Sequence, residues 1–311
     1  MKSRYTDIYF LPRGKGYQIA AQGKEGFKIL SNLTDQTAAT FINYFKFTAG
    51  LNLGETRRPQ MGAMDFTTEL QEKIYLRIST IGDFNNRESL VLRLIYPIID
   101  QISVFRSQDL ESLEYFTQRR GLMLFSGPTG SGKTTLIYYL ARKLAQKSMV
   151  MTVEDPVEVY EPTFLQTQVN LSAKMSYSEI IKACLRHRPD VLIIGEIRDE
   201  TSAHAAITAS LSGHLVFSTI HARSIYGVLD RLTDLGISMT TLKNCLNSVC
   251  YQRILPDQNQ NMKAMTQVFD GFKSDYQFSE KQVLKHWQNQ LITALNRSQI
   301  TKSTLERFIY G

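Results

Sequence analysis

The sequence predicts an α/β protein whose larger part is a parallel sheet covered by helices, and two observations lead to this prediction. From about residue 109 onward, short apolar runs alternate with segments that repeat apolar residues at helical spacing, which is typical of parallel strands joined through helices. The first of these runs is followed by a glycine-rich turn, "GPTGSGKTT" at 127–135, and then by an amphipathic segment. A strand, a glycine-rich turn and a helix in this order indicate a nucleotide-binding domain.

The remaining elements of this domain follow in order. Apolar runs predict strands at 122–125, 149–153, 191–194 and 215–219. Three helices are expected between them: one with Leu136, Ile137, Leu140, Leu144 and Ala145 on one face, one capped by Ser176 with Glu179, and one over 200–212 that stops at Gly213.

The chain is expected to have four parts: a small α/β N-terminal domain (1–97), a linker (98–108), the nucleotide-binding domain (109–255) and a helical C-terminal appendage (256–311). In the first part, Thr34 is a candidate N-cap, and Ala38, Phe41, Ile42 and Phe45 follow at helical spacing until Gly50. Pro97 and the loss of periodicity after it indicate the linker. In the last part, a capping box of Ser279 and Gln282 opens a helix whose apolar face contains Trp287.

Composition indicates a globular protein of a reducing compartment. The 311 residues are 43% hydrophobic and 21% charged, which excludes a disordered chain. No run of about eighteen apolar residues predicts a membrane span, and the N-terminus lacks the apolar region of a signal peptide. Three cysteines without a CxxC pair suit neither a disulfide framework nor a zinc site. We therefore expect a cytoplasmic protein.

The net charge of +7 allows two interpretations. It could reflect a polyanionic partner such as nucleic acid or an anionic membrane, or a generally basic surface. The lysines and arginines are scattered, without a block of five or more. This pattern favours the generally basic surface, and no direct binding of nucleic acid is expected.

The glycine-rich turn fits the pattern G-x-x-x-x-G-K-[ST] and predicts an ATP site. Its glycines let successive backbone N–H groups point at phosphates, and the start of the following helix adds its positive end. Lys133 is expected to reach the β- and γ-phosphates, and the Thr134 hydroxyl to bind Mg²⁺. The expected ATP-binding residues are Gly127, Pro128, Thr129, Gly130, Ser131, Gly132, Lys133, Thr134 and Thr135.

Glu196 directly follows the buried strand "VLIIG", where an unpaired carboxylate would be costly. In a parallel sheet, ligands bind at the carboxyl ends of the strands, so Glu196 is expected beside the phosphates and the metal. There it could orient or deprotonate the attacking water, or hold Mg²⁺ through a water. The alternative is an outward-facing salt bridge.

Two further stretches place polar groups after strands. "TVEDPVEVY" contains Glu154 and Asp155, candidate Mg²⁺ ligands, and Glu158, a candidate catalytic acid. All three could instead belong to a solvated loop. "GHLVFSTIHA" places His221 after a strand, where it could contact the γ-phosphate or could be purely structural.

These four stretches, in this order, resemble the Walker A, Asp box, Walker B and His box of the secretion ATPases that power type II secretion and type IV pili. "KFTAGLNLGETRRPQMGAM" (46–64) and "DIYFLP" (7–12) resemble parts of that family's N-terminal domain, so the resemblance covers about residues 5–255. It implies a PAS-like N-terminal domain, a RecA-like ATPase domain and a hexameric ring. It also implies arginines that close over the phosphates, here Arg77 in "YLRIST" and Arg93 in "LVLRLI".

Two departures from the family pattern narrow the expected function. The four-cysteine zinc element of many assembly ATPases is missing, so no zinc is expected, and so is the "AIRN"-like signature of retraction motors. A compact, zinc-free member resembles the competence pilus assembly ATPases of Gram-positive bacteria. The resemblance implies a hexameric, Mg²⁺-dependent ATPase at the inner face of the cell membrane, which acts on an integral-membrane platform protein and indirectly on pilins during DNA uptake.

Three alternatives remain. The chain could be a pilus retraction motor, a nucleic-acid translocase or a nucleotide-gated scaffold that barely hydrolyses ATP. A translocase is expected to interleave aromatic and basic residues on its pore loops, and no convincing stretch of this kind is present. A scaffold would tolerate the loss of the Glu196 carboxylate.

Overall fold

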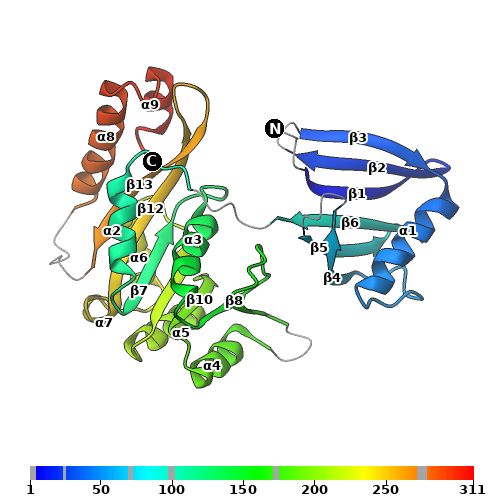
Figure 1. The fold of residues 1–311 in the computed structure, drawn as a ribbon, viewed down its shortest axis with the longest axis horizontal. Helices are drawn as coiled ribbons and strands as arrows, with labels where there is room; N and C mark the ends of the chain where they lie inside the picture. The colour runs from blue at the N-terminus through cyan, green and yellow to red at the C-terminus, as the bar shows by residue number, and fades with distance from the viewer. Residues whose placement is uncertain (1–4, 24–25, 69–72, 97–101, 171–174, 272–278) are drawn as a thin grey trace. The chain divides into compact units, whose positions relative to one another are not determined.

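The computed structural model describes residues 5–23, 26–68, 73–96, 102–170, 175–271 and 279–311. The chain divides into two compact units, residues 1–97 with 158–160 and residues 98–157 with 161–311. Each unit has one sheet and its own hydrophobic core (Figure 1). Within these described ranges, no helix is both long enough and apolar enough to cross a membrane.

The first unit is a six-stranded antiparallel sheet with one helix, α1 (Asp35–Thr48), against it. The strands lie in the order β3-β2-β1-β6-β5-β4. Their bounds are β1 (Tyr5–Arg13), β2 (Gly16–Gly23), β3 (Gly26–Leu33), β4 (Gln60–Thr67), β5 (Lys73–Gly82) and β6 (Glu88–Ile95).

Helix α1 has the predicted ends but not the whole predicted apolar face. The Thr34 side chain caps it by accepting a hydrogen bond from the Thr37 N–H, and Gly50 follows its end with φ of 69°. Ala38 and Ile42 are buried as expected, whereas Phe41 is 44% exposed. The third buried position of the helix is instead taken by Lys46.

Lys46 is fully buried because acceptors surround its ammonium group. Its Nζ donates to both carboxylate oxygens of Glu88, at 2.8 and 3.0 Å, and to the Glu55 carbonyl at 2.8 Å. The Glu55 carboxylate in turn accepts from the backbone N–H groups of Arg58 and Arg57, which lower its pKa. The segment that resembles the family's N-terminal motif is therefore built around a buried ion pair.

We expect Lys46→Met to lower the free energy of unfolding of this unit by about 3–5 kcal/mol, because the buried Glu88 carboxylate would lose its partner. The double variant Lys46→Met/Glu88→Leu should recover most of this loss, since it removes both charges together. Calorimetric unfolding of the full chain measures both effects. A double variant no more stable than Lys46→Met would contradict this account of the pair.

The second unit contains a seven-stranded sheet in the order β13-β12-β7-β11-β10-β8-β9. All neighbouring strands are parallel except β12 and β13, which are antiparallel. The bounds are β7 (Gly121–Ser126), β8 (Val150–Glu154), β9 (Leu165–Gln168), β10 (Val191–Glu196), β11 (Leu215–Ile220), β12 (Leu246–Pro256) and β13 (Met262–Asp270). The four strands predicted from apolar runs are β7, β8, β10 and β11.

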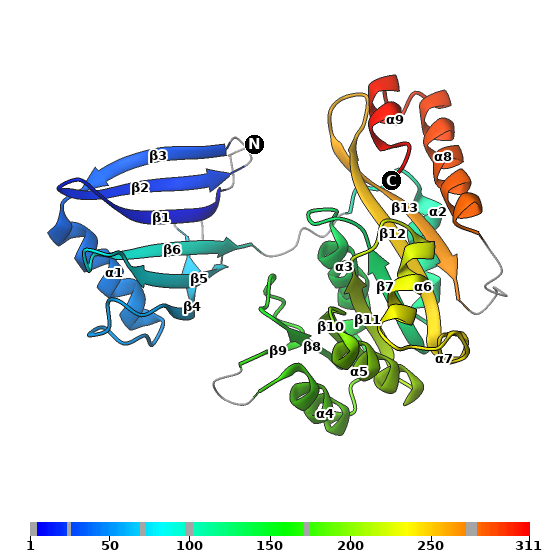
Figure 2. The same cartoon turned by 180° about the vertical axis from the view of Figure 1, so that it is seen from behind.

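Helices cover both faces of this sheet. Figure 1 looks onto the face that carries α2 and α3, and Figure 2 onto the face that carries α5 and α6. The bounds are α2 (Ser107–Phe116), α3 (Lys133–Ala145), α4 (Tyr177–His187), α5 (Glu200–Leu211), α6 (Ile225–Asp234), α7 (Met239–Cys245), α8 (Glu280–Asn296) and α9 (Lys302–Phe308). The predicted caps of α4 and α8, Ser176 and Ser279, are present.

The C-terminal part differs from the helical appendage expected over residues 256–311. Among the residues of this part that the structure describes, the helices are α8 and α9, and residues 262–270 form β13, an edge strand that pairs along its whole length with β12. A strand forms because the turn after Pro256 folds the chain back beside β12, whose backbone groups it then pairs. Trp287 of α8 is buried as expected, and its ring packs edge-on against Tyr251 of β12.

The end of the expected linker lies against β13. Residues 98–101 are outside the described residues. The backbone of Ser103 and Phe105 exchanges hydrogen bonds with Ala264 at 2.8 and 2.9 Å, and α2 starts at Ser107. Residues 103–107 therefore belong structurally to the second unit.

Candidate active site

The strand order brings four predicted stretches to one edge of the sheet. Four neighbouring strands lie in the order β7-β11-β10-β8. β7 leads into the glycine-rich turn, and β11 leads to His221. β10 ends at Glu196, and β8 ends at Glu154. These strands are parallel, so their carboxyl ends face the same way. One strand separates β7 from β10, which places their axes about 10 Å apart.

The glycine-rich turn can follow its path only because it contains glycines. Gly127 has φ of 142° and Gly132 has φ of 84°, values that L side chains rarely adopt. A Cβ atom on Gly127 would lie 2.2 Å from the carbonyl oxygen of Gln252. Gly132 is the N-cap of α3 and offers no side-chain cap, and the start of a helix is a place where backbone N–H groups bind anions.

Lys133 folds back over this turn. Its side chain is largely buried, and Nζ donates hydrogen bonds to the carbonyl oxygens of Gly127 at 2.9 Å and Pro128 at 3.0 Å. An ammonium group held at the mouth of a loop of positive-φ glycines provides a fixed positive charge for a phosphate. Thr134 and Thr135 follow in the first turn of α3.

Glu196 lies at a local irregularity of the sheet. The register between β10 and β11 shifts at Gly195, and the Thr219 hydroxyl bonds the Gly195 carbonyl at 2.8 Å. The Glu196 side chain is 19% exposed and carries two basic neighbours: Arg198 Nε donates to one carboxylate oxygen, and His221 Nε2 lies 3.5 Å from the other. Glu196 and His221, which come from two separate motifs, are thus brought together.

The two acids at the end of β8 differ in burial. Glu154 is buried and accepts a hydrogen bond from the Tyr138 hydroxyl at 2.7 Å, whereas Asp155 is exposed and lies 3.6 Å from Nη1 of Arg198. Arg198 therefore bridges Asp155 and Glu196. Sequence reasoning did not single out Arg198, although it follows Glu196 by only two residues.

Tyr177 adds a neutral hydroxyl to this cluster. A Cβ atom on Gly195 would lie 3.3 Å from the Tyr177 oxygen, so the phenol covers the glycine that precedes Glu196. Burial raises the pKa of Tyr177 to about 12. Its hydroxyl therefore keeps its proton at physiological pH and remains a hydrogen-bond donor.

His221 lies in a loop that is fixed to the end of β7. The Ser126 hydroxyl donates to the Ala222 carbonyl at 3.1 Å and accepts from the Ala222 N–H at 3.2 Å. Ser126 immediately precedes Gly127, so the loops after β7 and β11 share a hydrogen-bonded contact. The His221 side chain is 54% exposed, which leaves it accessible to a ligand.

Gln252 of β12 is a second residue that sequence reasoning missed. Its side chain is buried, and Nε2 donates to the carbonyl oxygen of Ser131, within the glycine-rich turn, at 2.6 Å. The hint in the sequence is that two polar residues, Gln252 and Arg253, interrupt the otherwise apolar stretch "VCYQRIL".

The two predicted arginines lie in the first unit. Arg77 of β5 and Arg93 of β6 are register partners on neighbouring antiparallel strands, so their side chains share a face. Arg93 Nε also pairs with Asp7 at 2.8 Å. Glu158 is exposed and groups with this first unit, whereas Glu154 and Asp155 belong to the second.

The residues present suit a nucleotide with Mg²⁺. Mg²⁺ prefers oxygen ligands and usually takes one or two from the protein and the rest from water and phosphates. The Thr134 hydroxyl and the carboxylates of Glu154, Asp155 and Glu196 are donors of this kind. Among the described residues, no three His, Cys, Asp or Glu side chains form a ready-made metal cage.

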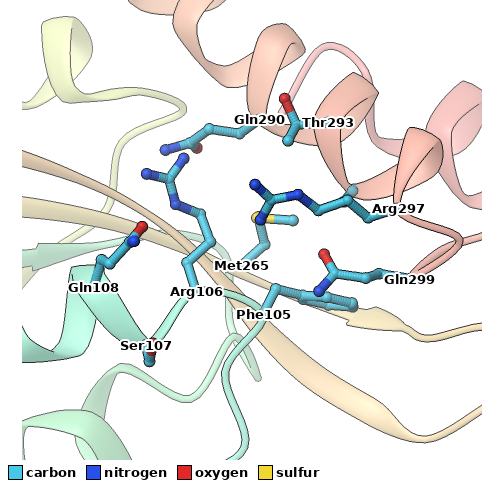
Figure 3. A pocket seen from close by; sticks show the side chains of 10 residues that line it. Phe105, Arg106, Ser107, Gln108, Met265, Gln290, Thr293, Arg297 and Gln299 are labelled. Carbon is cyan, nitrogen blue, oxygen red and sulfur yellow. The ribbon is translucent and has the colours of Figure 1, made fainter.

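A separate cavity of about 270 Å³ lies between the start of α2, β13 and the end of α8 (Figure 3). None of the glycine-rich turn residues lines it. The Arg106 guanidinium in its wall is already engaged, because Nε lies 3.4 Å from the Asp109 carboxylate. This cavity is therefore distinct from the candidate nucleotide site.

Comparison with known proteins identifies relatives over nearly the whole chain. The family described as "Type II/IV secretion system protein" matches residues 1–304. Competence protein ComGA of Streptococcus pneumoniae is 44% identical over 306 residues, which are 98% of this chain and 93% of that protein. Competence protein ComGA of Bacillus subtilis is 36% identical over 261 residues, 81% of this chain and 72% of that protein.

Solved structures match the fold. The pilus retraction motor PilT with bound ADP aligns with a TM-score of 0.75 and 19% identity, over 98% of this chain and 93% of that one. The Legionella pneumophila ATPase DotB aligns with a TM-score of 0.70 and 18% identity, over 98% and 91% of the two chains. These matches confirm the expected RecA-like α/β fold, and the resemblance to secretion ATPases is confirmed by the family match.

Proposed function

The chain belongs to the family of type II/IV secretion system proteins, and we propose that it is an ATP-hydrolysing motor that drives assembly of a competence type IV pilus. The observation that carries this proposal is the order of the strands: the turn that leads to Lys133 follows the carboxyl end of β7, Glu196 ends β10, and one strand, β11, lies between them. The assignment to competence rests on the relatives named as competence proteins, which include the 44% identical protein of Streptococcus pneumoniae.

In the proposed reaction, the N–H groups of the glycine-rich turn and Lys133 hold the phosphates of ATP. Glu196 takes a proton from a water molecule while the oxygen of that water forms a bond to the γ-phosphorus. The bond from this phosphorus to the bridging oxygen breaks, and ADP and phosphate leave. Arg198 orients the Glu196 carboxylate, and His221 contacts the γ-phosphate.

Mg²⁺, when bound, would neutralise charge on the β- and γ-phosphates. The Thr134 hydroxyl would bind it directly, and the carboxylates of Glu154, Asp155 and Glu196 would act directly or through water. Oxygen-only donors of this kind suit Mg²⁺.

The proposed motor is a ring of six copies in which Arg77 and Arg93 close over the phosphates, with Glu158 as a further acid at the site. A guanidinium suits this task because it stays charged and spreads its donors over a planar fork. The shared face of the two arginines supports a common target.

We expect Arg77→Gln and Arg93→Gln each to reduce ATP turnover by at least about tenfold, because charge on the transferred phosphoryl group would lose a stabilising cation. Arg87→Gln is the matched control: this arginine lies in the same unit, directly before β6, where it contacts Asp83 and the Gly14 carbonyl. Steady-state ATPase assays of the three variants test this. Equal turnover in all three variants would contradict a role of Arg77 and Arg93 at the phosphates.

In the cell, the motor would act at the inner face of the membrane on an integral-membrane platform protein, and through it on pilins. A strain that lacks the gene should lose surface pili and transformation. The wild-type chain should restore both, and the Glu196→Gln variant neither. Normal pili in the Glu196→Gln strain would overturn the motor function, and stimulation of ATPase activity by single-stranded DNA would favour a translocase instead.

A further inference from the structure

The glycine-rich turn packs against one residue of β12 at both of its ends. At the first end, a Cβ atom on Gly127 would lie 2.2 Å from the Gln252 carbonyl oxygen. At the last end, a Cβ atom on Gly132 would lie 2.9 Å from Gln252 Nε2 and 3.3 Å from Ile254 Cδ1. The turn thus packs closely against the backbone and side chain of Gln252. The strand that contains this residue, β12, includes none of the motifs predicted from the sequence.

Between these ends, Gln252 also bonds the turn directly. Its Nε2 donates to the Ser131 carbonyl at 2.6 Å, and the Gln252 side chain is 2% exposed. We infer, on the basis of the proposed ATP site, that Gln252 is a positioning residue that holds the turn in the shape that binds phosphate. It does not touch the reacting atoms, and it acts through the backbone of residues 127–132.

The effect of Gln252 on nucleotide affinity depends on how many molecules hold the turn in the shape that binds phosphate. If only a fraction of molecules holds the binding-competent shape, the apparent affinity for nucleotide falls by that fraction. Loss of the carboxamide donor would leave the Ser131 carbonyl without this bond and would release the turn from β12. Lys133 and Glu196 would be unchanged, so turnover at saturating ATP should change much less than affinity.

Gln267 of β13 provides a matched control in the same hairpin. Its side chain is also buried, its Nε2 also donates to a backbone carbonyl, that of Val283 in α8, at 3.0 Å, and it lies in register with Tyr251, the residue before Gln252. Gln267→Met therefore removes an equivalent buried hydrogen bond that holds a C-terminal helix and not the turn. A purely structural role for Gln252 predicts the same outcome for both variants.

The test compares wild-type protein, Gln252→Met and Gln267→Met. Binding of ADP is measured by calorimetry, steady-state ATP hydrolysis gives KM and kcat, and thermal unfolding without nucleotide measures stability. We expect Gln252→Met to bind ADP about fivefold more weakly, the effect of one lost neutral hydrogen bond. Its KM should rise by a similar factor with kcat within about twofold of wild type. Gln267→Met should bind ADP as tightly as the wild type does. Its thermal stability should be the same as that of Gln252→Met.

Equal ADP affinity in the two variants would overturn the positioning role and leave the proposed ATPase intact. If the wild-type chain itself binds no ADP, the proposed function fails together with this inference. If Gln252→Met does not fold, Gln252→Asn replaces it, because its carboxamide is retained but is one methylene too short to reach Ser131. The same loss of affinity is expected of Gln252→Asn, and its absence would overturn the inference.

Discussion

Replacement of Glu196 by Gln is expected to reduce ATP turnover by a factor of about 10²–10⁴ while ATP binding is retained. Gln has the same shape but cannot accept the proton of the attacking water. The phosphates would still meet Lys133 and the N–H groups of the glycine-rich turn, because the turn lies between β7 and α3, Lys133 begins α3, and neither belongs to β10. Phosphate release gives the turnover, and a fluorescent ATP analogue gives the affinity.

Asp190→Asn is the control for this variant. Asp190 precedes the same strand at its opposite end, where it accepts from the Met149 N–H at 2.9 Å, so its change should leave turnover unaltered. A Glu196→Gln variant that hydrolyses ATP at the wild-type rate would favour the nucleotide-gated scaffold.

Replacement of Lys133 by Met is expected to weaken ATP binding by about 10- to 150-fold. This range corresponds to the loss of one hydrogen bond to a charged group, which contributes about 1.5–3 kcal/mol. The same change removes the bonds from Nζ to the carbonyls of Gly127 and Pro128, so the turn also loses part of its own support. Calorimetric titration with ATP and with ADP measures the effect.

Lys143→Met is the control for the loss of Lys133. Lys143 lies on the same helix, but its ammonium pairs with the Glu114 carboxylate and its side chain is 49% exposed. Its removal should leave nucleotide affinity unchanged. If Lys133→Met binds ATP as tightly as the wild type, the glycine-rich turn is not the phosphate site.

The features that the sequence predicts well depend on local pattern. Four apolar runs became β7, β8, β10 and β11, and the glycine-rich turn lies between β7 and α3, because a run of aliphatic residues favours a buried strand whatever surrounds it. The approach of Glu196 to His221 was also predictable, since parallel strands align their carboxyl ends.

The features that the sequence did not reveal depend on contacts between distant segments. Residues 262–270, which form β13, were expected to belong to a helical appendage, and their strand form depends on pairing with β12. Gln252 and Arg198 act through neighbours 121 and 43 residues away, Ser131 and Asp155. Glu158 lies four residues after Glu154, yet it groups with the other unit. Beyond the end of a strand, nearness in sequence therefore does not indicate that two residues belong to the same unit.

The most direct test of the ATPase site is an experimental structure of the Glu196→Gln variant with Mg²⁺ and ATP. The γ-phosphate should lie against Lys133, with one water between it and the side chain at position 196, so that the phosphorus is about 6 Å from the nearest atom of that side chain. A γ-phosphate that lies well beyond the reach of one bridging water from residue 196, or a nucleotide bound elsewhere, would contradict the account.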